Sequence, residues 1–173
     1  MVPRLNIRAE IPADGPAIRA IHLLAFETSQ EANLVDKLRN HAAAQVSMVA
    51  EHDGAIVGHL LFSPVKLGVG MAETHGLGLA PIGVLPHLQK RGIGSQLIRS
   101  ALRGLEETGC PFVVALGNPG FYARFGFRPA REFGVRCKWD VPADSFMLLP
   151  LDKDRIALAA GLAHYSEEFD SLV

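Results

Sequence analysis

The sequence predicts an α/β fold in which helices flank a central mixed sheet of roughly six or seven strands. Short apolar runs typical of strands recur along most of the chain, and segments with helical periodicity interrupt them twice, where a parallel crossover needs a helix. The length of 173 residues fits one domain, so we expect a single domain over residues 1–173. A hydrophobic share of 49% and a charged share of 20% are typical of a globular protein with a substantial core.

The N-terminal part of the chain predicts one strand followed by two helices. Residues 5–9 alternate between apolar and polar side chains, which is typical of a strand. Pro12 and Asp14 then begin a helix, and a second helix is expected over residues 30–40. The apolar face of the first helix holds Ile18, Ile21, His22, Ala25 and Phe26, and that of the second holds Leu34, Val35 and Leu38.

The middle of the chain predicts a hairpin and a buried strand. Strands over residues 46–51 and 56–65 flank the pair Asp53-Gly54, and Asp-Gly between two apolar runs is a strong hairpin signal. Residues 77–84 are apolar at successive positions, so both faces of this strand should be covered. Pro81 has no N–H for a ladder, so the pairing of this strand must break or bulge there.

The C-terminal half completes the expected order β-α-α-β-β-β-α-β-α-β-β. Apolar residues recur at helical spacing over residues 92–108, and Gly109 supplies the stop. Further elements are expected as a strand over 112–116, a short helix over 121–125, and strands over 132–138 and 145–151. The tail over residues 154–173 is weakly patterned, and no structure is predicted for it.

Charge and composition exclude several classes of function. With 17 Lys+Arg against 18 Asp+Glu, the net charge of −1 does not favour a nucleic acid or a membrane surface as partner. Cys110 and Cys137 form no disulfide framework, and neither they nor the seven histidines show metal-ligand spacing, so we expect no metal. The longest apolar stretch is about half of what a membrane span needs, and no signal peptide is visible. We therefore expect a cytoplasmic location.

A candidate anion site lies between the buried strand and the long helix that follows it. The first backbone N–H groups of a helix have no partner within it and stabilise an anion. Gly92 and Gly94 carry no side chain to block a phosphate, and Lys90 and Arg91 add positive charge. A Rossmann fingerprint fails because position 97 is Leu, and the Gly-Lys-Ser/Thr end of a P-loop is absent. An ordinary helix start with two flexible glycines remains the structural alternative.

The pattern Gln89-x-x-Gly92-x-Gly94, after Ile82-Gly83-Val84-x-Pro86, resembles the acetyl-CoA motif of the GCN5-related N-acetyltransferase (GNAT) superfamily. The resemblance implies a GNAT-type acyl-CoA N-acyltransferase fold with acetyl-CoA as cosubstrate. It also implies a splay beside the strand, where the thioester would lie. The residues that it implies for binding are Ile82, Gly83 and Val84 along the pantetheine arm, and Gln89, Lys90, Arg91, Gly92, Ile93, Gly94 and Ser95 at the pyrophosphate.

A second segment, residues 117–127, resembles the other cofactor motif of this family. The resemblance places Tyr122 near the sulfur of coenzyme A as the general acid. Asn118 is assigned either to the pantetheine or to an Asx turn. The phenylalanines of this segment, Phe121, Phe125 and Phe127, are expected to be core and helix-packing residues. The resemblance spans about residues 6–151 and is nearest to the bacterial YhbS-like branch.

An amine must lose its proton to attack a thioester, because an amine of pKa about 10.4 is almost fully protonated at neutral pH. The candidate bases are Glu73, His75, Glu27 and Glu31, of which Glu73, before the central strand, is named first. Each of them also fits a solvated loop residue. No sequence motif provides a serine or cysteine nucleophile, so direct attack by the amine is expected.

The acceptor is expected to be a small-molecule or protein amine that the sequence does not identify. A non-catalytic coenzyme A-binding sensor or structural module is the alternative, because it would keep Gln89, Gly92 and Gly94 without an acid or an acceptor pocket. Apolar residues near the C-terminus suggest a homodimer, and those considered are Phe146, Leu148 and Phe169.

Overall fold

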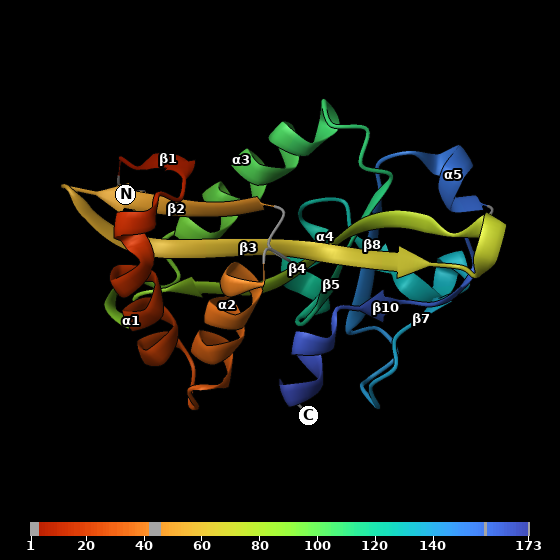
Figure 1. Cartoon of the computed structure of the whole chain (residues 1–173). Helices are drawn as coiled ribbons and strands as arrows, with labels where there is room; N and C mark the ends of the chain where they lie inside the picture. Colours follow the sequence, from red (N-terminus) through yellow and green to blue (C-terminus); the bar gives the residue numbers. More distant parts are fainter. Residues whose placement is uncertain (1–3, 42–45, 158, 173) are drawn as a thin grey trace. The chain divides into compact units, whose positions relative to one another are not determined.

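The computed structural model describes residues 4–41, 46–157 and 159–172 (Figure 1). The strands are β1 (Asn6–Ala9), β2 (Val46–His52), β3 (Ala55–Leu67), β4 (Thr74–Val84), β5 (Phe112–Leu116), β6 (Arg128–Pro129), β7 (Val135–Arg136), β8 (Phe146–Pro150), β9 (Gly161–Leu162) and β10 (His164–Tyr165). The α-helices are α1 (Gly15–Ala25), α2 (Gln30–Asn40), α3 (Ile93–Glu106), α4 (Pro119–Ala123) and α5 (Lys153–Ala157). Short 3-10 turns are η1 (Pro12–Asp14), η2 (Gly70–Ala72), η3 (Pro86–Leu88), η4 (Ala130–Phe133) and η5 (Glu167–Leu172).

The main sheet has eight strands, in the order β1-β2-β3-β4-β5-β8-β6, with β10 also pairing with β3. β4 and β5 are parallel, whereas the β1–β2, β2–β3, β5–β8 and β6–β8 pairs are antiparallel, so the predicted mixed sheet is confirmed. At the predicted hairpin, Asp53 and Gly54 have φ values of 50° and 79°, as a tight turn between twisted strands requires.

The pairing of β4 with β5 runs from Leu77 to Leu79, opposite Val113 to Ala115. The ladder therefore ends before Pro81, as the missing N–H of that residue predicts.

Two elements differ from the prediction. The strand expected over 132–138 is replaced by η4 and by the two-residue β7, which pairs with β9 outside the main sheet. The reason is Gly134, whose left-handed φ of 70° ends η4 and breaks an extended path. The short helix expected over 121–125 begins earlier, at Pro119, because the side chain of Asn118 caps it.

The described part of the tail consists of the short elements α5, β9, β10 and η5. Phe146, Leu148 and Phe169, which suggested a dimer surface, are all buried within the chain. They therefore supply no surface for a second copy, and the homodimer stays a prediction. Among the described residues, no helix combines the length and apolarity that crossing a bilayer would need.

The chain divides into two compact units, and the single domain stays a prediction. Unit 1 comprises residues 1–62, 81–103 and 168–173, and unit 2 comprises 63–80 and 104–167. Buried residues of unit 1 come from its helices and strands, and include Ile18, Ile21, Leu34, Leu38, Leu60, Leu61, Phe62, Ile93 and Leu97. The core of unit 2 includes Val65, Leu67, Phe112, Val114, Val135, Phe146, Leu148 and Ile156.

Two glycines of unit 1 allow helices to approach the strands closely. A Cβ at Gly58 of β3 would lie 3.1 Å from side-chain carbons of Ile93 and Leu97, in the first turns of α3. A Cβ at Gly83 of β4 would lie 3.0 Å from the ring of His22 on α1. The start of α3 is thus held against β3, and the end of β4 against α1.

Candidate functional site

The loop between β4 and α3 has an unusual backbone. Lys90 and Gly92 have left-handed φ values of 59° and 82°. A left-handed lysine costs of the order of 1 kcal/mol, and such strain is concentrated at functional sites. The Nε2 amide of Gln89 donates a hydrogen bond of 3.1 Å to the carbonyl of Val84. This bond closes the loop on the last residue of β4, so Gln89 shapes the turn that leads to the helix.

The charge at the start of α3 suits a diphosphate. Lys90 and Arg91 are exposed, and the helix of 14 residues brings its positive end to the same loop. Gly94 lies in the first turn without a left-handed φ, so its lack of a side chain, rather than its flexibility, is the relevant feature. The side chains of Ile93 and Ser95 are buried, so at Ile93 only the backbone can serve a phosphate.

The second predicted segment lies in unit 2. Asn118 caps α4: its Oδ1 accepts a hydrogen bond of 3.1 Å from the N–H of Phe121, so the turn role is present. Tyr122 is 6% exposed, and its ring packs on the backbone of Gly117, where a Cβ would come within 2.9 Å. Burial raises the pKa of Tyr122 to about 12, so its phenol is protonated at neutral pH.

The four candidate bases are not brought together. In unit 2, Glu73 binds His75 Nε2 at 2.8 Å and Lys66 Nζ at 3.5 Å in a partly exposed cluster. Glu73 precedes β4, whereas the loop follows its last residue, so the 11 residues of the strand separate them. In unit 1, Glu27 is exposed and Glu31 accepts a long hydrogen bond of 3.5 Å from Thr28.

Comparison with known proteins identifies the family. The model of the acetyltransferase (GNAT) domain matches residues 6–130. An uncharacterized N-acetyltransferase of Escherichia coli, YhbS, is 36% identical over 165 residues, which cover 95% of this chain and 98% of YhbS.

The chain belongs to the GNAT acetyltransferase family.

Two solved GNAT structures resemble this chain over nearly its whole length. The crystal structure of Escherichia coli YhbS in complex with CoA has a TM-score of 0.90 and 35% identity, and covers 98% of this chain and 94% of its own. A GNAT acetyltransferase from Brucella melitensis in complex with acetyl-CoA has a TM-score of 0.79 and 34% identity, covering 96% of this chain and 99% of its own. The expected GNAT fold is therefore confirmed.

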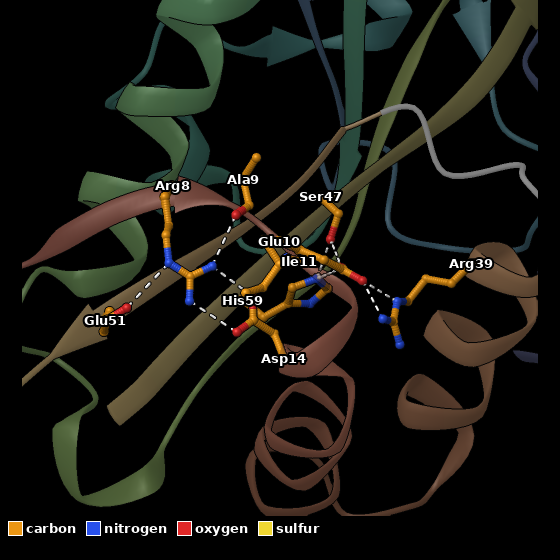
Figure 2. Close-up of polar contacts among 9 residues, drawn as sticks. All are labelled: Arg8, Ala9, Glu10, Ile11, Asp14, Arg39, Ser47, Glu51 and His59. Carbon is orange, nitrogen blue, oxygen red and sulfur yellow. Dashed lines mark hydrogen bonds and ion pairs between the residues drawn. The ribbon is translucent and has the colours of Figure 1, made fainter. Parts of the chain in front are cut away.

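This GNAT protein also contains a polar chain, formed by the half-buried Glu10 and Ser47 and the buried His59 and His22, that the sequence did not predict. Figure 2 shows its outer part, where Arg39 and Ser47 both bind the carboxylate of Glu10. Ser47 Oγ lies 2.8 Å from His59 Nε2, and His59 Nδ1 lies 2.8 Å from His22 Nε2. Both histidines are fully buried.

The charges around the polar chain determine its protonation. Burial lowers the pKa of His22 to about 3 and also lowers the pKa of His59, so both rings are neutral at neutral pH. Burial raises the pKa of Glu10, but hydrogen bonds from His59 and Ser47 and the charge of Arg39 outweigh it. The pKa of Glu10 therefore lies below its ordinary value, and the carboxylate is charged.

A neighbouring ion pair fixes the turn between β1 and α1. Arg8 donates hydrogen bonds to both carboxylate oxygens of Asp14, at 2.7 and 3.0 Å, and a third to Glu51 at 3.3 Å (Figure 2). The hydrogen bonds from Arg8 lower the pKa of Asp14 to about 2. This arrangement places Glu10, which lies between β1 and η1, next to Ser47 of β2.

One signal in the sequence does indicate the polar chain. His22 occupies the apolar face of its helix, and His59 lies within the apolar run 56–65. A histidine on a buried face needs a partner, because unpaired buried polar groups are costly. The two histidines are 37 residues apart in the sequence, so spacing alone does not reveal that they are partners.

Proposed function

We propose that this chain transfers the acetyl group of acetyl-CoA to the nitrogen of an amine by direct attack. The observation that carries the proposal is the loop from Gln89 to Ser95, where a strained turn, two exposed cations and a helix start meet. The YhbS complex with CoA and the Brucella melitensis complex with acetyl-CoA support it, because both are similar to this chain along nearly their whole length.

Acetyl-CoA would supply the acetyl group as a thioester. The backbone of Gly92, Ile93 and Gly94 would bind the pyrophosphate with Lys90 and Arg91, and Gln89 would hold the turn in shape. Ile82, Gly83 and Val84 would line the pantetheine arm, Asn118 would contact that arm, and Ser95 would join the residues at the pyrophosphate. Tyr122 would donate a proton to the departing thiolate, and Glu73 remains a candidate base from its place before β4.

A binding assay with an amine screen tests this function. Acetyl-CoA at 100 times its Kd should raise the melting temperature by roughly 5–10 °C, and NADH should not. Isotope-labelled acetyl-CoA incubated with polyamines, amino acids, aminoglycosides and peptides should then yield an acetylated amine by mass spectrometry. Binding without transfer to any amine would favour the coenzyme A-binding sensor, and stabilisation by NADH alone would contradict both functions.

Removal of the Tyr122 hydroxyl should slow the reaction modestly. Tyr122→Phe keeps the ring that packs on Gly117 and removes only the proton donor. General acid catalysis is typically worth about 10²–10⁴-fold. We expect the low end, because the raised pKa makes this phenol a weak acid and a thiolate leaves readily. Steady-state kinetics should show kcat reduced about 10²-fold and the KM for acetyl-CoA within a few fold. An unchanged kcat with chemistry rate-limiting would exclude Tyr122 as the acid.

We further propose that the enzyme is cytoplasmic, that it needs no metal, and that residues 1–173 act as a single domain. Among the described residues, no cluster of three or more His, Cys, Asp or Glu side chains has the arrangement of a metal site. We also propose a homodimer, and we assign no interface to it.

A further inference from the structure

The polar chain has a direction that follows from its charged end. A carboxylate only accepts hydrogen bonds, so the Ser47 hydroxyl donates to Glu10. The Ser47 oxygen then accepts from the Nε2–H of His59. A neutral imidazole carries one N–H, so His59 Nδ1 must be an acceptor, and His22 Nε2–H donates to it. By the same rule, His22 Nδ1 carries a lone pair and no hydrogen.

This lone pair faces the strand that carries the candidate site. His22 Nδ1 is fully buried and has no hydrogen-bond partner in the structure. A Cβ on Gly83 would lie 3.0 Å from it, so the nitrogen abuts β4 where the strand has no side chain. The residues from Gly76 to Val84 include no titratable group, so the part of β4 that leads to the candidate loop supplies no base from its own side chains.

We propose that His22 Nδ1 accepts the proton of the attacking amine through a water molecule, and that the polar chain holds it in the acceptor form. The inference rests on the proposed function, which places the pantetheine arm along Ile82 and Val84, on either side of Gly83. The amine nitrogen forms a bond to the acetyl carbon while the carbon–sulfur bond breaks, and the electron pair leaves on sulfur. The surplus proton of the nitrogen passes to water, and the water passes a proton to His22 Nδ1.

The carboxylate of Glu10 acts at a distance in this step. When His22 gains a second hydrogen, its positive charge is offset through the directed hydrogen bonds that end on Glu10. Because burial lowers the pKa of His22, the proton does not stay there and returns through water to solvent. His22 acts through water, so it is a positioning residue for the proton transfer.

One isosteric substitution reverses the polar chain. Arg39 only donates, and it binds Oε1 of Glu10, whereas Ser47 binds Oε2. In Glu10→Gln the amide oxygen therefore keeps Arg39, and the amide NH2 faces Ser47 and donates to it. Every bond then turns round: Ser47 donates to His59 Nε2, His59 Nδ1–H donates to His22 Nε2, and His22 Nδ1 carries the hydrogen. The contacts are kept while the acceptor is lost.

Nuclear magnetic resonance of ¹⁵N-histidine-labelled protein without ligand tests the direction. Ring nitrogen shifts distinguish a bare nitrogen from an N–H, and His22→Gln and His59→Gln assign the signals among the seven histidines. The native protein should show His22 with Nε2–H and a bare Nδ1 at pH 7. Glu10→Gln should show the opposite tautomer. Native protein with a hydrogen on Nδ1, or Glu10→Gln with an unchanged tautomer, would overturn the inference whatever the enzyme does.

Steady-state kinetics test the proton transfer, with an amine found in the screen as acceptor. If no amine accepts the acetyl group, hydrolysis of acetyl-CoA is measured instead. His22→Gln, which keeps a donor toward His59, and Glu10→Gln should each lower kcat about 10²-fold with the KM for acetyl-CoA unchanged. Ser47→Ala should do the same, and Ser47→Thr should recover most of the loss because it restores the hydroxyl. His164→Gln, at an exposed position of β10, is the matched control and should match native protein.

The outcomes separate this inference from the proposed function. If native protein transfers acetyl and folded Glu10→Gln and His22→Gln retain its kcat, the inference fails and the function stands. If native protein neither binds acetyl-CoA nor consumes it, the function fails, and the role of His22 fails with it. If kcat falls in each variant only in proportion to its loss of melting temperature, and Ser47→Thr restores neither, the polar chain serves folding alone.

Discussion

Acidification from pH 7 to pH 5 is expected to lower the free energy of unfolding by about 2 kcal/mol through His22 alone. Burial lowers the pKa of His22 from 6.5 to about 3, so between these values the unfolded chain binds a proton that the folded chain does not. Stability is thus fully present above pH 6.5 and is lost as the pH falls toward 3. The limiting loss is about 5 kcal/mol, at about 1.4 kcal/mol per pH unit.

The titratable groups near His22 also lower the free energy of unfolding as the pH falls. His59 also has a lowered pKa, mainly from burial, and adds to the loss below pH 6.5. Glu10 and Asp14 have lowered pKa values, so their stabilising contributions are present above the ordinary pKa values of 4.5 and 3.8 and are lost as the pH falls below these. Arg8 forms an ion pair with Asp14, and Arg39 forms one with Glu10.

Urea unfolding at pH 5, 6 and 7 measures this dependence. In His22→Gln, the difference in unfolding free energy between pH 7 and pH 5 should be about 2 kcal/mol smaller than in native protein, because the variant lacks this titrating group. His164→Gln should keep the native dependence, since that side chain is exposed. A native protein whose unfolding free energy is constant from pH 7 to pH 5 would contradict the burial of two neutral rings.

Gly94→Val is expected to weaken acetyl-CoA binding by about 10²-fold or more. A branched side chain in the first turn of α3 would keep a phosphate from the backbone N–H groups there. Hydrogen bonds to a charged group are worth about 1.5–3 kcal/mol each, so the loss of two such bonds amounts to about 10²-fold or more. Gly92 is the poorer position for the test, because its φ of 82° adds backbone strain to any substitution.

Gly104→Val is the matched control for this substitution. Gly104 lies in the same helix, and a Cβ there would meet nothing within 4 Å. Both variants replace a helical glycine by valine, so their intrinsic helix propensities change alike. Titration calorimetry on the folded proteins should show native affinity for Gly104→Val and strongly reduced affinity for Gly94→Val. Equal affinities would mean that Gly94 serves only the packing of the helix.

The parts of the fold that the sequence predicted well are those with strong local signals. The helix α3, the Asp53-Gly54 turn and the strand 112–116 each follow from periodicity or turn chemistry within a dozen residues. The strand expected over 132–138 failed because Gly134, at a left-handed φ, ended a 3-10 turn inside an alternating pattern. Local alternation does not reveal where a backbone turns.

The candidate site divides in a similar way. The loop Gln89–Ser95 and Tyr122 were found from contiguous motifs, and their binding and catalytic roles stay predictions. The polar chain was not found, because Glu10, Ser47, His59 and His22 come from separate segments and meet only through sheet pairing and helix packing. Its one local sign, histidines within apolar patterns, indicates a buried partner without saying which one.

The polar chain also governs how the N-terminal edge of the sheet can open. β1 has four residues and lies at the end of the strand order, where a short strand would ordinarily fray. Detaching it would withdraw Glu10 from Arg39 and Ser47 and leave two buried imidazoles without their terminal acceptor. Its amides are therefore expected to exchange with solvent only when α1 and the adjoining strands open together. We therefore expect this four-residue edge strand to open in the same cooperative unit as the helix that abuts Gly83.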